Sequence, residues 1–142
     1  MQHISTSAER TIELGSSFAK RLTGGTAVCL IGDLGAGKTQ FMKGIAQGLG
    51  IVKPITSPTF VLLKQYPVLR SDKPPLTLNH LDLYRVGGDI EALGFGIDDL
   101  LTQDQITCIE WADRLTDVLP PDALEVRFEY VDDTTRRITI PD

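Results

Sequence analysis

The stretch AVCLIGDLGAGKT, residues 27–39, decides the fold of this 142-residue chain. Its first five residues are continuously apolar, which is typical of a strand buried on both faces within a parallel sheet. The other eight residues fit the pattern G-x-x-x-x-G-K-[ST], and the segment that follows, to residue 49, predicts a helix. A buried strand, a glycine-rich bend and a helix in this order form the setting in which the pattern binds phosphate.

The bend offers main-chain and side-chain donors to a phosphate group. Its glycines let the backbone curl so that successive N–H groups point inward, and the helix presents its first-turn donors at the same place. Lys38 is expected to reach the outer phosphates, and the Thr39 hydroxyl to bind Mg²⁺. The alternative, a glycine-rich turn with an incidental Lys-Thr pair, fits the strand and helix context less well. We therefore expect a nucleoside triphosphate here, contacted by Asp33, Leu34, Gly35, Ala36, Gly37, Lys38, Thr39 and Gln40.

Helices and strands alternate on both sides of this stretch. Before it, Thr6 and Glu9 form a capping-box pattern, from which an amphipathic helix is expected to run to about Leu22. After it, the sequence predicts strands over residues 60–63, 76–84 and 106–109, the first two pairing antiparallel, and short helices over residues 90–101 and 112–119.

The C-terminal segment, residues 124–140, predicts a hairpin. Apolar and charged residues alternate on one side of an Asp-Asp-Thr-Thr turn, and a second short strand follows the turn. We therefore expect a single α/β domain over residues 1–142. Its architecture should be a three-layer P-loop NTPase fold with a mixed, mostly parallel sheet, helices on both faces and a C-terminal β-hairpin.

Composition excludes several classes of protein. With 42% hydrophobic and 23% charged residues the chain suits a folded globular domain, and its central apolar run is far shorter than the ~20 residues that a membrane span needs. The N-terminus holds no apolar stretch that resembles a secretory signal, so a cytoplasmic protein is expected. Cys29 and Cys108 lack metal-ligand or disulfide spacing and are expected to be buried. The net charge of −5 argues against stable nucleic-acid binding by this chain alone.

Two carboxylates are candidates for the metal side of a hydrolytic site. Glu110 directly follows the predicted strand over residues 106–109, at the carboxyl edge where ligands of open α/β sheets gather. Asp82 lies in a strand whose alternation places it on the same face as His80 and Tyr84. A solvated residue at a strand end is the alternative for either carboxylate, but the phosphate-binding bend favours a functional role for at least one. His80 itself is expected to be a core or surface histidine rather than a metal ligand.

Other residues near these elements also have two interpretations. Thr59 lies on the segment after the bend's helix, where NTPase switch loops offer a hydroxyl to Mg²⁺, but a proline-initiated turn is equally compatible with the spacing. Trp111, the single tryptophan, is either partly buried packing or an aromatic that senses nucleotide or partner. Arg85 and Arg114 are either transition-state charge stabilisers or surface salt-bridge residues.

Four motifs taken together resemble the TsaE family, the ATPase subunit of bacterial tRNA threonylcarbamoyladenosine synthesis. They are GDLGAGKT at residues 32–39, SPTF at 57–60, HLDLYR at 80–85 and IEWA at 109–112. Their order and intervals match the family, and the resemblance covers nearly the whole chain. The first motif alone indicates an NTPase, and the other three make the match specific.

This resemblance implies a small Mg²⁺-dependent ATPase that joins the TsaD and TsaB proteins and supports turnover of the complex that modifies the adenosine next to the tRNA anticodon. The transfer chemistry belongs to the partner, so tRNA contact is indirect. The resemblance also implies roles for individual residues. Thr39 and Glu110 match magnesium-side residues, and Lys38 matches the phosphate lysine. Asp82 matches a residue linked to hydrolysis, and Trp111 an aromatic needed for activity. The family motifs also contain Thr59, Ser57 and Tyr84, and the candidates near the adenine are Thr6 and Arg136 or Arg137.

Three other functions remain open on the sequence alone. A small-molecule kinase would share the bend but needs a lid, for which residues 70–76 are a short, proline-rich candidate. A GTPase switch is disfavoured because no Asn-Lys-x-Asp segment occurs. A nucleotide-gated adaptor would bind the nucleotide without needing its hydrolysis.

Overall fold

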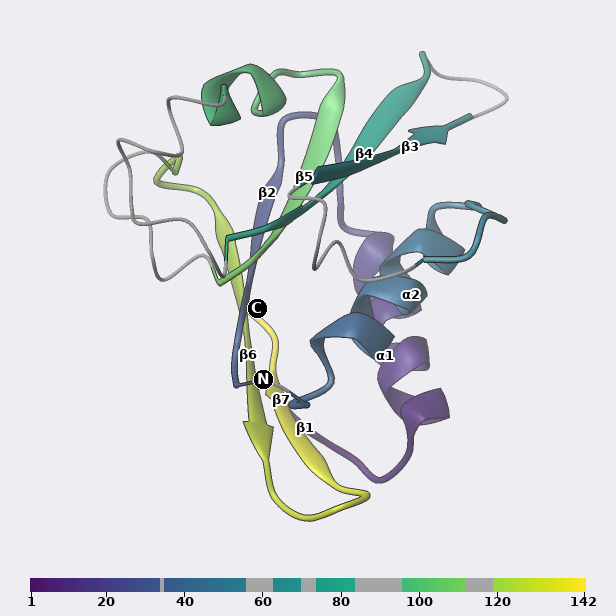
Figure 1. Cartoon of the computed structure of the whole chain (residues 1–142), viewed down its shortest axis with the longest axis vertical. Helices are drawn as coiled ribbons and strands as arrows, with labels where there is room; N and C mark the ends of the chain where they lie inside the picture. The colour runs from purple at the N-terminus through teal and green to yellow at the C-terminus, as the bar shows by residue number, and fades with distance from the viewer. Residues whose placement is uncertain (34, 56–62, 70–73, 84–95, 112–118) are drawn as a thin grey trace.

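The computed structural model describes residues 1–33, 35–55, 63–69, 74–83, 96–111 and 119–142. Within these residues seven strands form one mixed sheet in the order β1-β7-β6-β2-β5-β4-β3, as Figure 1 shows. The strands are β1 (Gln2–Ser5), β2 (Ala27–Ile31), β3 (Leu63–Val68), β4 (Leu76–Asp82), β5 (Gln105–Glu110), β6 (Leu124–Tyr130) and β7 (Arg136–Thr139).

The parallel part of the sheet lies in its middle. β2 pairs in parallel with β5 on one side and β6 on the other, and β4 continues the parallel set beyond β5. The antiparallel pairs are β3 with β4, β6 with β7 and β1 with β7. The predictions of a central buried strand over residues 27–31 and of a C-terminal hairpin are therefore confirmed. The predicted antiparallel pair is also present, but β3 overlaps the strand predicted over residues 60–63 only at Leu63.

Two helices, α1 (Ala8–Ala19) and α2 (Lys38–Gly48), lie against one face of this sheet, to the right in Figure 1. The prediction that Thr6 begins the first helix was wrong by one residue. Ser7 is the N-cap, and its hydroxyl accepts a hydrogen bond from the Arg10 main chain at 3.0 Å. The shift arises because β1 extends through Ser5, paired with Arg136, so that Thr6 is an exposed residue of the connection.

The two helices pack unusually close together. A Cβ atom on Gly44 of α2 would lie 2.1 Å from the Ile12 carbonyl oxygen of α1, and one on Gly15 of α1 would lie 2.2 Å from the Phe41 carbonyl oxygen of α2. Glycine at these crossing points lets the two backbones touch. The start of α2, and with it the glycine-rich bend, is therefore held against α1.

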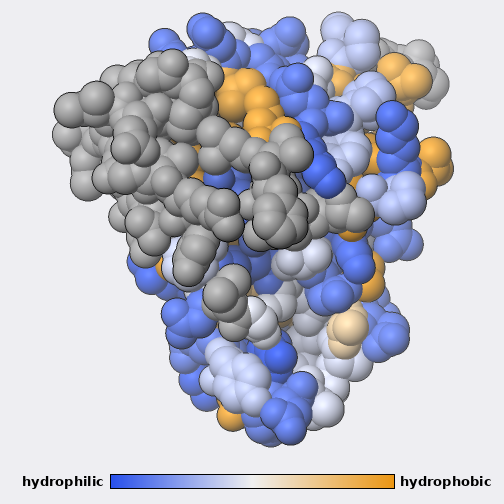
Figure 2. All heavy atoms as spheres, viewed as in Figure 1, coloured by the Kyte–Doolittle hydropathy of each residue, from blue (hydrophilic) through white to orange (hydrophobic). Residues whose placement is uncertain are grey.

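The surface over the C-terminal hairpin is mostly polar. In Figure 2 the lower end, over the hairpin of β6 and β7, is largely hydrophilic. Along β6, Glu125, Arg127 and Glu129 are exposed, whereas Val126 and Phe128 between them are buried, as the alternation in the sequence predicts. Within the described residues, no helix combines the length and the apolar character that crossing a membrane requires.

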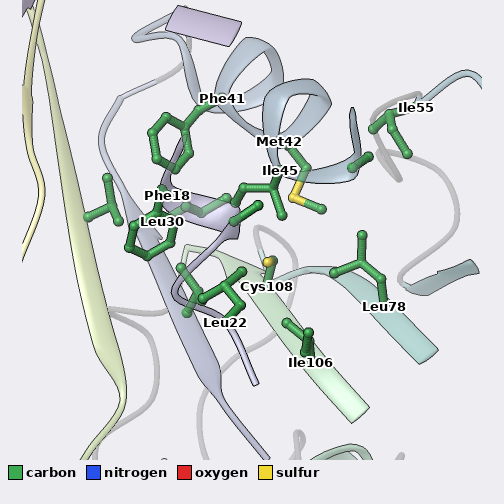
Figure 3. Close-up of a cluster of buried hydrophobic side chains, with 14 of the residues drawn as sticks. Phe18, Leu22, Leu30, Phe41, Met42, Ile45, Ile55, Leu78, Ile106 and Cys108 are labelled. Atoms are coloured by element: carbon green, nitrogen blue, oxygen red, sulfur yellow. The ribbon is translucent and has the colours of Figure 1, made fainter. Parts of the chain in front are cut away.

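Apolar residues fill both faces of the sheet. One core cluster lies between the sheet and the two helices, and Figure 3 shows part of it: Phe18, Leu22, Leu30, Phe41, Met42, Ile45, Ile55, Leu78, Ile106 and Cys108. A second cluster covers the opposite face and joins the strands to the 3₁₀ helix η1 (Ile97–Leu100). Its buried members are Cys29, Leu81, Leu83, Ile97, Leu100 and Ile109. The α/β fold with a mixed sheet and helices is thus confirmed, with α1 and α2 on one face and η1 on the other.

Several predicted elements fall on residues that the structure does not describe. They are the first part of the strand over residues 60–63, the first half of the helix over residues 90–101 and nearly all of the helix over residues 112–119. In the described half of the helix predicted over residues 90–101 the structure has η1, a single 3₁₀ turn. β1 was absent from the predictions: it is a short, polar strand that gains its hydrogen bonds from β7, at the other end of the chain.

Candidate functional site

The glycine-rich bend connects the carboxyl end of β2 to the start of α2. Gly35 and Gly37 have φ values of 78° and 104°, in the left-handed region that residues with a Cβ atom rarely adopt. Gly32 is required for a different reason, because a Cβ atom there would lie 2.7 Å from the Phe128 carbonyl oxygen of β6. The three glycines thus let the chain turn tightly beside the sheet and bring the positive end of the α2 dipole to the bend.

Lys38, the first residue of α2, is buried inside this turn and only 5% exposed. Its ammonium group donates a hydrogen bond to the Gly32 carbonyl oxygen at 2.5 Å. The same nitrogen lies 4.1 Å from the centre of the Trp111 ring, within the range of a cation–π interaction. Thr39 and Gln40 follow at half-buried positions on the first turn of α2, and Asp33 is exposed.

Glu110 ends β5 directly beside the bend. In the register of the parallel strands it lies opposite Leu30, the penultimate residue of β2, and opposite Asp82, the last residue of β4. Asp82 is half-buried and, by strand alternation, shares a face with His80. The structure therefore brings Lys38, Glu110 and Asp82 to the same carboxyl edge of the sheet, as the sequence predicts.

Glu110 forms a buried pair with His80. The Nε2 atom of His80 lies 2.6 Å from Oε2 of Glu110, and the two residues are 0% and 5% exposed. The other ring nitrogen of His80, Nδ1, is buried and has no hydrogen-bond partner among the described residues. Glu110 also contributes, after burial and Cys29, to raising the pKa of the Cys108 thiol. The pair was not predicted from the sequence, because the alternation within β4 does not give the register of β4 with β5.

Trp111 follows Glu110 with a φ of +62°, the one positive value at a residue other than glycine in the described part of the chain. For a bulky side chain this conformation is a strained outlier, and such strain, of the order of 1–3 kcal/mol, gathers at functional sites. The conformation turns the chain sharply after β5. It leaves the Trp111 ring half-buried, against both the second core cluster and the ammonium group of Lys38.

Arg136 of β7 reaches the bend from the other side. Its Nε atom donates to the Gly35 carbonyl oxygen at 3.0 Å, and its guanidinium lies 4.6 Å from the centre of the Tyr130 ring. Further guanidinium hydrogen bonds go to the carbonyl oxygens of Asp132 and Thr135 in the hairpin turn. Arg136 is thus fixed between the hairpin and the bend.

The turn that carries Arg136 is closed by the Asp132 carboxylate. This carboxylate accepts hydrogen bonds from the main-chain N–H groups of Thr134 at 3.0 Å and Thr135 at 2.9 Å, and these bonds, that of Thr134 first, lower the pKa of Asp132. Arg137 instead pairs with Glu129 at 3.0 Å. Thr6 lies between β1 and α1.

Six of the predicted residues cannot be placed. Leu34, Ser57, Thr59, Tyr84, Arg85 and Arg114 lie outside the residues that the structure describes. The proline-rich segment considered as a lid is also only partly described.

A glycine-rich bend between a central parallel strand and a helix, with a lysine inside the turn and a carboxylate at the end of the neighbouring strand, defines a P-loop NTPase-type protein. The family model described as "Threonylcarbamoyl adenosine biosynthesis protein TsaE" matches residues 5–138, and the chain belongs to this family. The resemblance seen in the four sequence motifs is confirmed.

Individual relatives agree with the family match. The chain is 36% identical over 140 residues to the tRNA threonylcarbamoyladenosine biosynthesis protein TsaE of Treponema pallidum, with 99% of each chain covered. It is 38% identical over 132 residues to the protein of the same name from Streptomyces coelicolor, covering 90% of this chain and 87% of the relative. The crystal structure of Bacillus subtilis YdiB superimposes with a TM-score of 0.79 at 30% identity, over 99% of this chain and 83% of that chain.

Proposed function

We propose that this protein binds ATP with Mg²⁺ at the glycine-rich bend and hydrolyses the ATP in support of threonylcarbamoyl modification of tRNA. The observation that carries the proposal is that Lys38 lies buried inside the bend after β2, while Glu110 ends β5, the strand paired with β2. A buried cation inside the turn suits a polyphosphate, and a carboxylate beside it suits a metal ion bound to that polyphosphate. The names of the relatives supply the biological process.

The donors at this edge of the sheet fit magnesium. Mg²⁺ prefers oxygen ligands and usually takes one or two from the protein, the rest being phosphate oxygens and water. The Thr39 hydroxyl and the Glu110 carboxylate are oxygen donors of this kind, on adjacent elements. In the part of the chain that the structure describes, no group of three or more His, Cys, Asp or Glu side chains is arranged so that it could hold a metal ion. When bound, the ion would neutralise charge that develops on the phosphate oxygens.

The remaining residues of the proposed site bind and orient the nucleotide. Lys38 exchanges its hydrogen bond to the Gly32 carbonyl for the outer phosphates, which the main-chain N–H groups of residues 33–40 also contact. Glu110 or Asp82 accepts a hydrogen bond from the attacking water and orients it. Arg136 fixes the bend on the side of α1 and the hairpin, where we place the nucleoside together with Thr6. Thr59, Ser57, Tyr84 and Trp111 remain predicted participants.

The proposed partners are the TsaD and TsaB proteins of the modifying complex, with tRNA reached through them in the cytoplasm. The net charge of −5 supports this division of labour, because an acidic chain gains little from the phosphate backbone of RNA. We expect a slow ATPase when the chain is alone and coupling to the partner proteins when it is in the complex.

Replacing Glu110 by Gln tests the proposed site. We expect ATP to bind with affinity near that of the unchanged protein, because the phosphate contacts remain, while hydrolysis falls by about 10²-fold or more. The measurements are release of labelled phosphate and binding of a fluorescent ATP analogue. Glu125→Gln, an exposed change on β6, is the matched control and should alter neither quantity.

Two results would contradict the proposal. Unchanged turnover in Glu110→Gln would remove the carboxylate from the reaction and favour a nucleotide-gated adaptor. Transfer of the labelled phosphate to a nucleoside or sugar in preference to water would identify a small-molecule kinase.

A further inference from the structure

We propose that His80 is a positioning residue that holds the Glu110 carboxylate in the orientation needed on the metal side of the site. The inference rests on the function proposed above and extends it to a residue that the sequence analysis treated as an ordinary histidine. His80 does not itself touch nucleotide or metal in this proposal; it acts through Glu110.

The first argument is geometric. His80 lies on β4 and Glu110 on β5, and the parallel register pairs His80 with Cys108 and Asp82 with Glu110. The two side chains are therefore on one face of adjacent strands, two residues apart along the ladder, and their nitrogen and oxygen meet at 2.6 Å. Both backbones are held by the sheet, so the histidine ring presents its Nε2 atom to the carboxylate from a fixed direction.

The second argument concerns the hydrogen bond itself. The proposal takes the Glu110 carboxylate as ionised; an ionised carboxylate only accepts, so Nε2 of His80 is the donor of the hydrogen bond to Oε2 of Glu110. Water does not compete, because the residues are 0% and 5% exposed, and a charge-assisted hydrogen bond is stronger in such surroundings. Because Oε2 accepts the hydrogen bond from the ring, we assign Oε1 as the oxygen that binds the metal ion. Outer partners of this kind fix how a metal ligand is presented.

The third argument is that stability does not explain a histidine at this position. The ring is fully buried, yet its Nδ1 atom has no hydrogen-bond partner among the described residues. Burying an unpaired polar nitrogen opposes folding, and an apolar side chain of similar size would avoid that penalty. Buried residues that are unfavourable for folding are expected mainly at functional positions. The side-chain hydrogen bond of His80 goes to Glu110, so the function of His80 is sought there.

The experiment compares His80→Leu with His80→Gln. Leucine removes the donor, whereas the side-chain nitrogen of glutamine lies at a distance from the backbone similar to that of Nε2 and can still donate to Glu110. We expect His80→Leu to lower both the hydrolysis rate and the affinity for Mn²⁺ in the presence of ADP by about 10- to 100-fold. Its unfolding temperature should fall as well, because the buried Glu110 carboxylate loses a hydrogen-bond donor. His80→Gln should recover most of both losses. Mn²⁺ binding is followed by electron paramagnetic resonance, and His3→Gln on β1 is the control.

A second comparison shows whether His80 acts through Glu110. In a Glu110→Gln background, adding His80→Leu should cause no further loss of Mn²⁺ affinity, since the coupled partner is already gone. If the two substitutions lower Mn²⁺ affinity independently and additively, the proposal is overturned. It is also overturned if His80→Leu leaves turnover and Mn²⁺ affinity unchanged while Glu110→Gln alone lowers them. If Glu110→Gln alone changes neither property, the proposed function itself fails, so the two failures are distinguishable.

A measurement on the metal-free protein covers the case in which His80→Leu does not fold. The chain has two histidines, so the nitrogen resonances of the two rings can be assigned by comparison with His3→Gln. We expect the ring of His80 to carry its proton on Nε2, with a resonance that shifts in Glu110→Gln. A His80 resonance that is the same in Glu110→Gln and in the unchanged protein would overturn the proposal.

Discussion

At the scale of single residues, Arg136 and Arg137 on β7 show how neighbours in sequence reach different surroundings. Successive side chains of a strand point to opposite faces. Arg136 shares the face of the helices and bonds to Gly35 in the bend, whereas Arg137 pairs with Glu129 on the other face. The sequence named both arginines as candidates, and the geometry supports Arg136.

Replacing these two arginines by alanine gives a matched test. We expect Arg136→Ala to weaken ATP binding by roughly tenfold, about 1.4 kcal/mol, because the bend loses a charge-assisted hydrogen bond and a nearby cation. Arg137→Ala should leave the affinity within about twofold, since exposed ion pairs contribute little. Isothermal titration with a non-hydrolysable ATP analogue measures both. Equal losses for the two variants would contradict this placement.

At the scale of elements, the contact between α1 and α2 sets the position of the bend. Gly44 and Gly15 face backbone atoms of the opposite helix, which cannot move aside as a flexible side chain can. Helix propensity alone would favour alanine over glycine by about 1 kcal/mol at each position. Steric exclusion and propensity therefore act in opposite directions, which makes substitution informative.

Gly44→Ala tests which of the two effects dominates. A Cβ atom placed 2.1 Å from a carbonyl oxygen forces the helices apart, so we expect the free energy of unfolding to fall by about 2–3 kcal/mol despite the gain in propensity. Lys43→Ala, on the exposed side of α2, should change it by less than about 0.5 kcal/mol. Urea denaturation followed by Trp111 fluorescence gives both values. A Gly44→Ala variant at least as stable as the original would show that the helices separate without strain.

At the scale of the whole molecule, the two ends of the chain meet. β1 pairs with β7, and the N-terminal amino group donates to the Ile140 carbonyl oxygen at 2.6 Å. Arg21, just after α1, adds a hydrogen bond from its guanidinium to the Asp142 carbonyl oxygen at 2.9 Å. The hairpin that carries Arg136 is in this way attached to the start of α1.

The overall charge predicts how the protein meets tRNA. With 14 basic against 19 acidic residues, we expect the chain alone to bind tRNA with a dissociation constant weaker than about 10⁻⁴ M at physiological salt, the weak end of non-specific binding. When TsaD and TsaB are added, we expect the chain to be retained in a complex that contains tRNA. Filter binding at two salt concentrations is the measurement. Micromolar binding by the chain alone, weakening steeply with salt, would point to a basic face that net charge does not reveal.

Local patterns account for what could be predicted. The apolar run of β2, the glycines of the bend and the alternation of β6 each place their signal within a few consecutive residues, so these elements were predicted correctly. β1 escaped prediction because its hydrogen bonds come from β7, more than 130 residues away, and its own residues carry little apolar signal. The N-cap of α1 is Ser7 rather than the predicted Thr6, because the end of β1, which is paired with β7, limits where the helix can start.

The glycine-rich bend and the family could be recognised from short segments, because G-x-x-x-x-G-K-[ST] and the three shorter motifs are each continuous in the chain. Folding, by contrast, brings His80 to Glu110, places Arg136 rather than Arg137 at the bend, and puts Trp111, in the left-handed region, against Lys38. These facts depend on the register between strands that are far apart in sequence. A register is set by the packing of the whole sheet, and no single segment carries it.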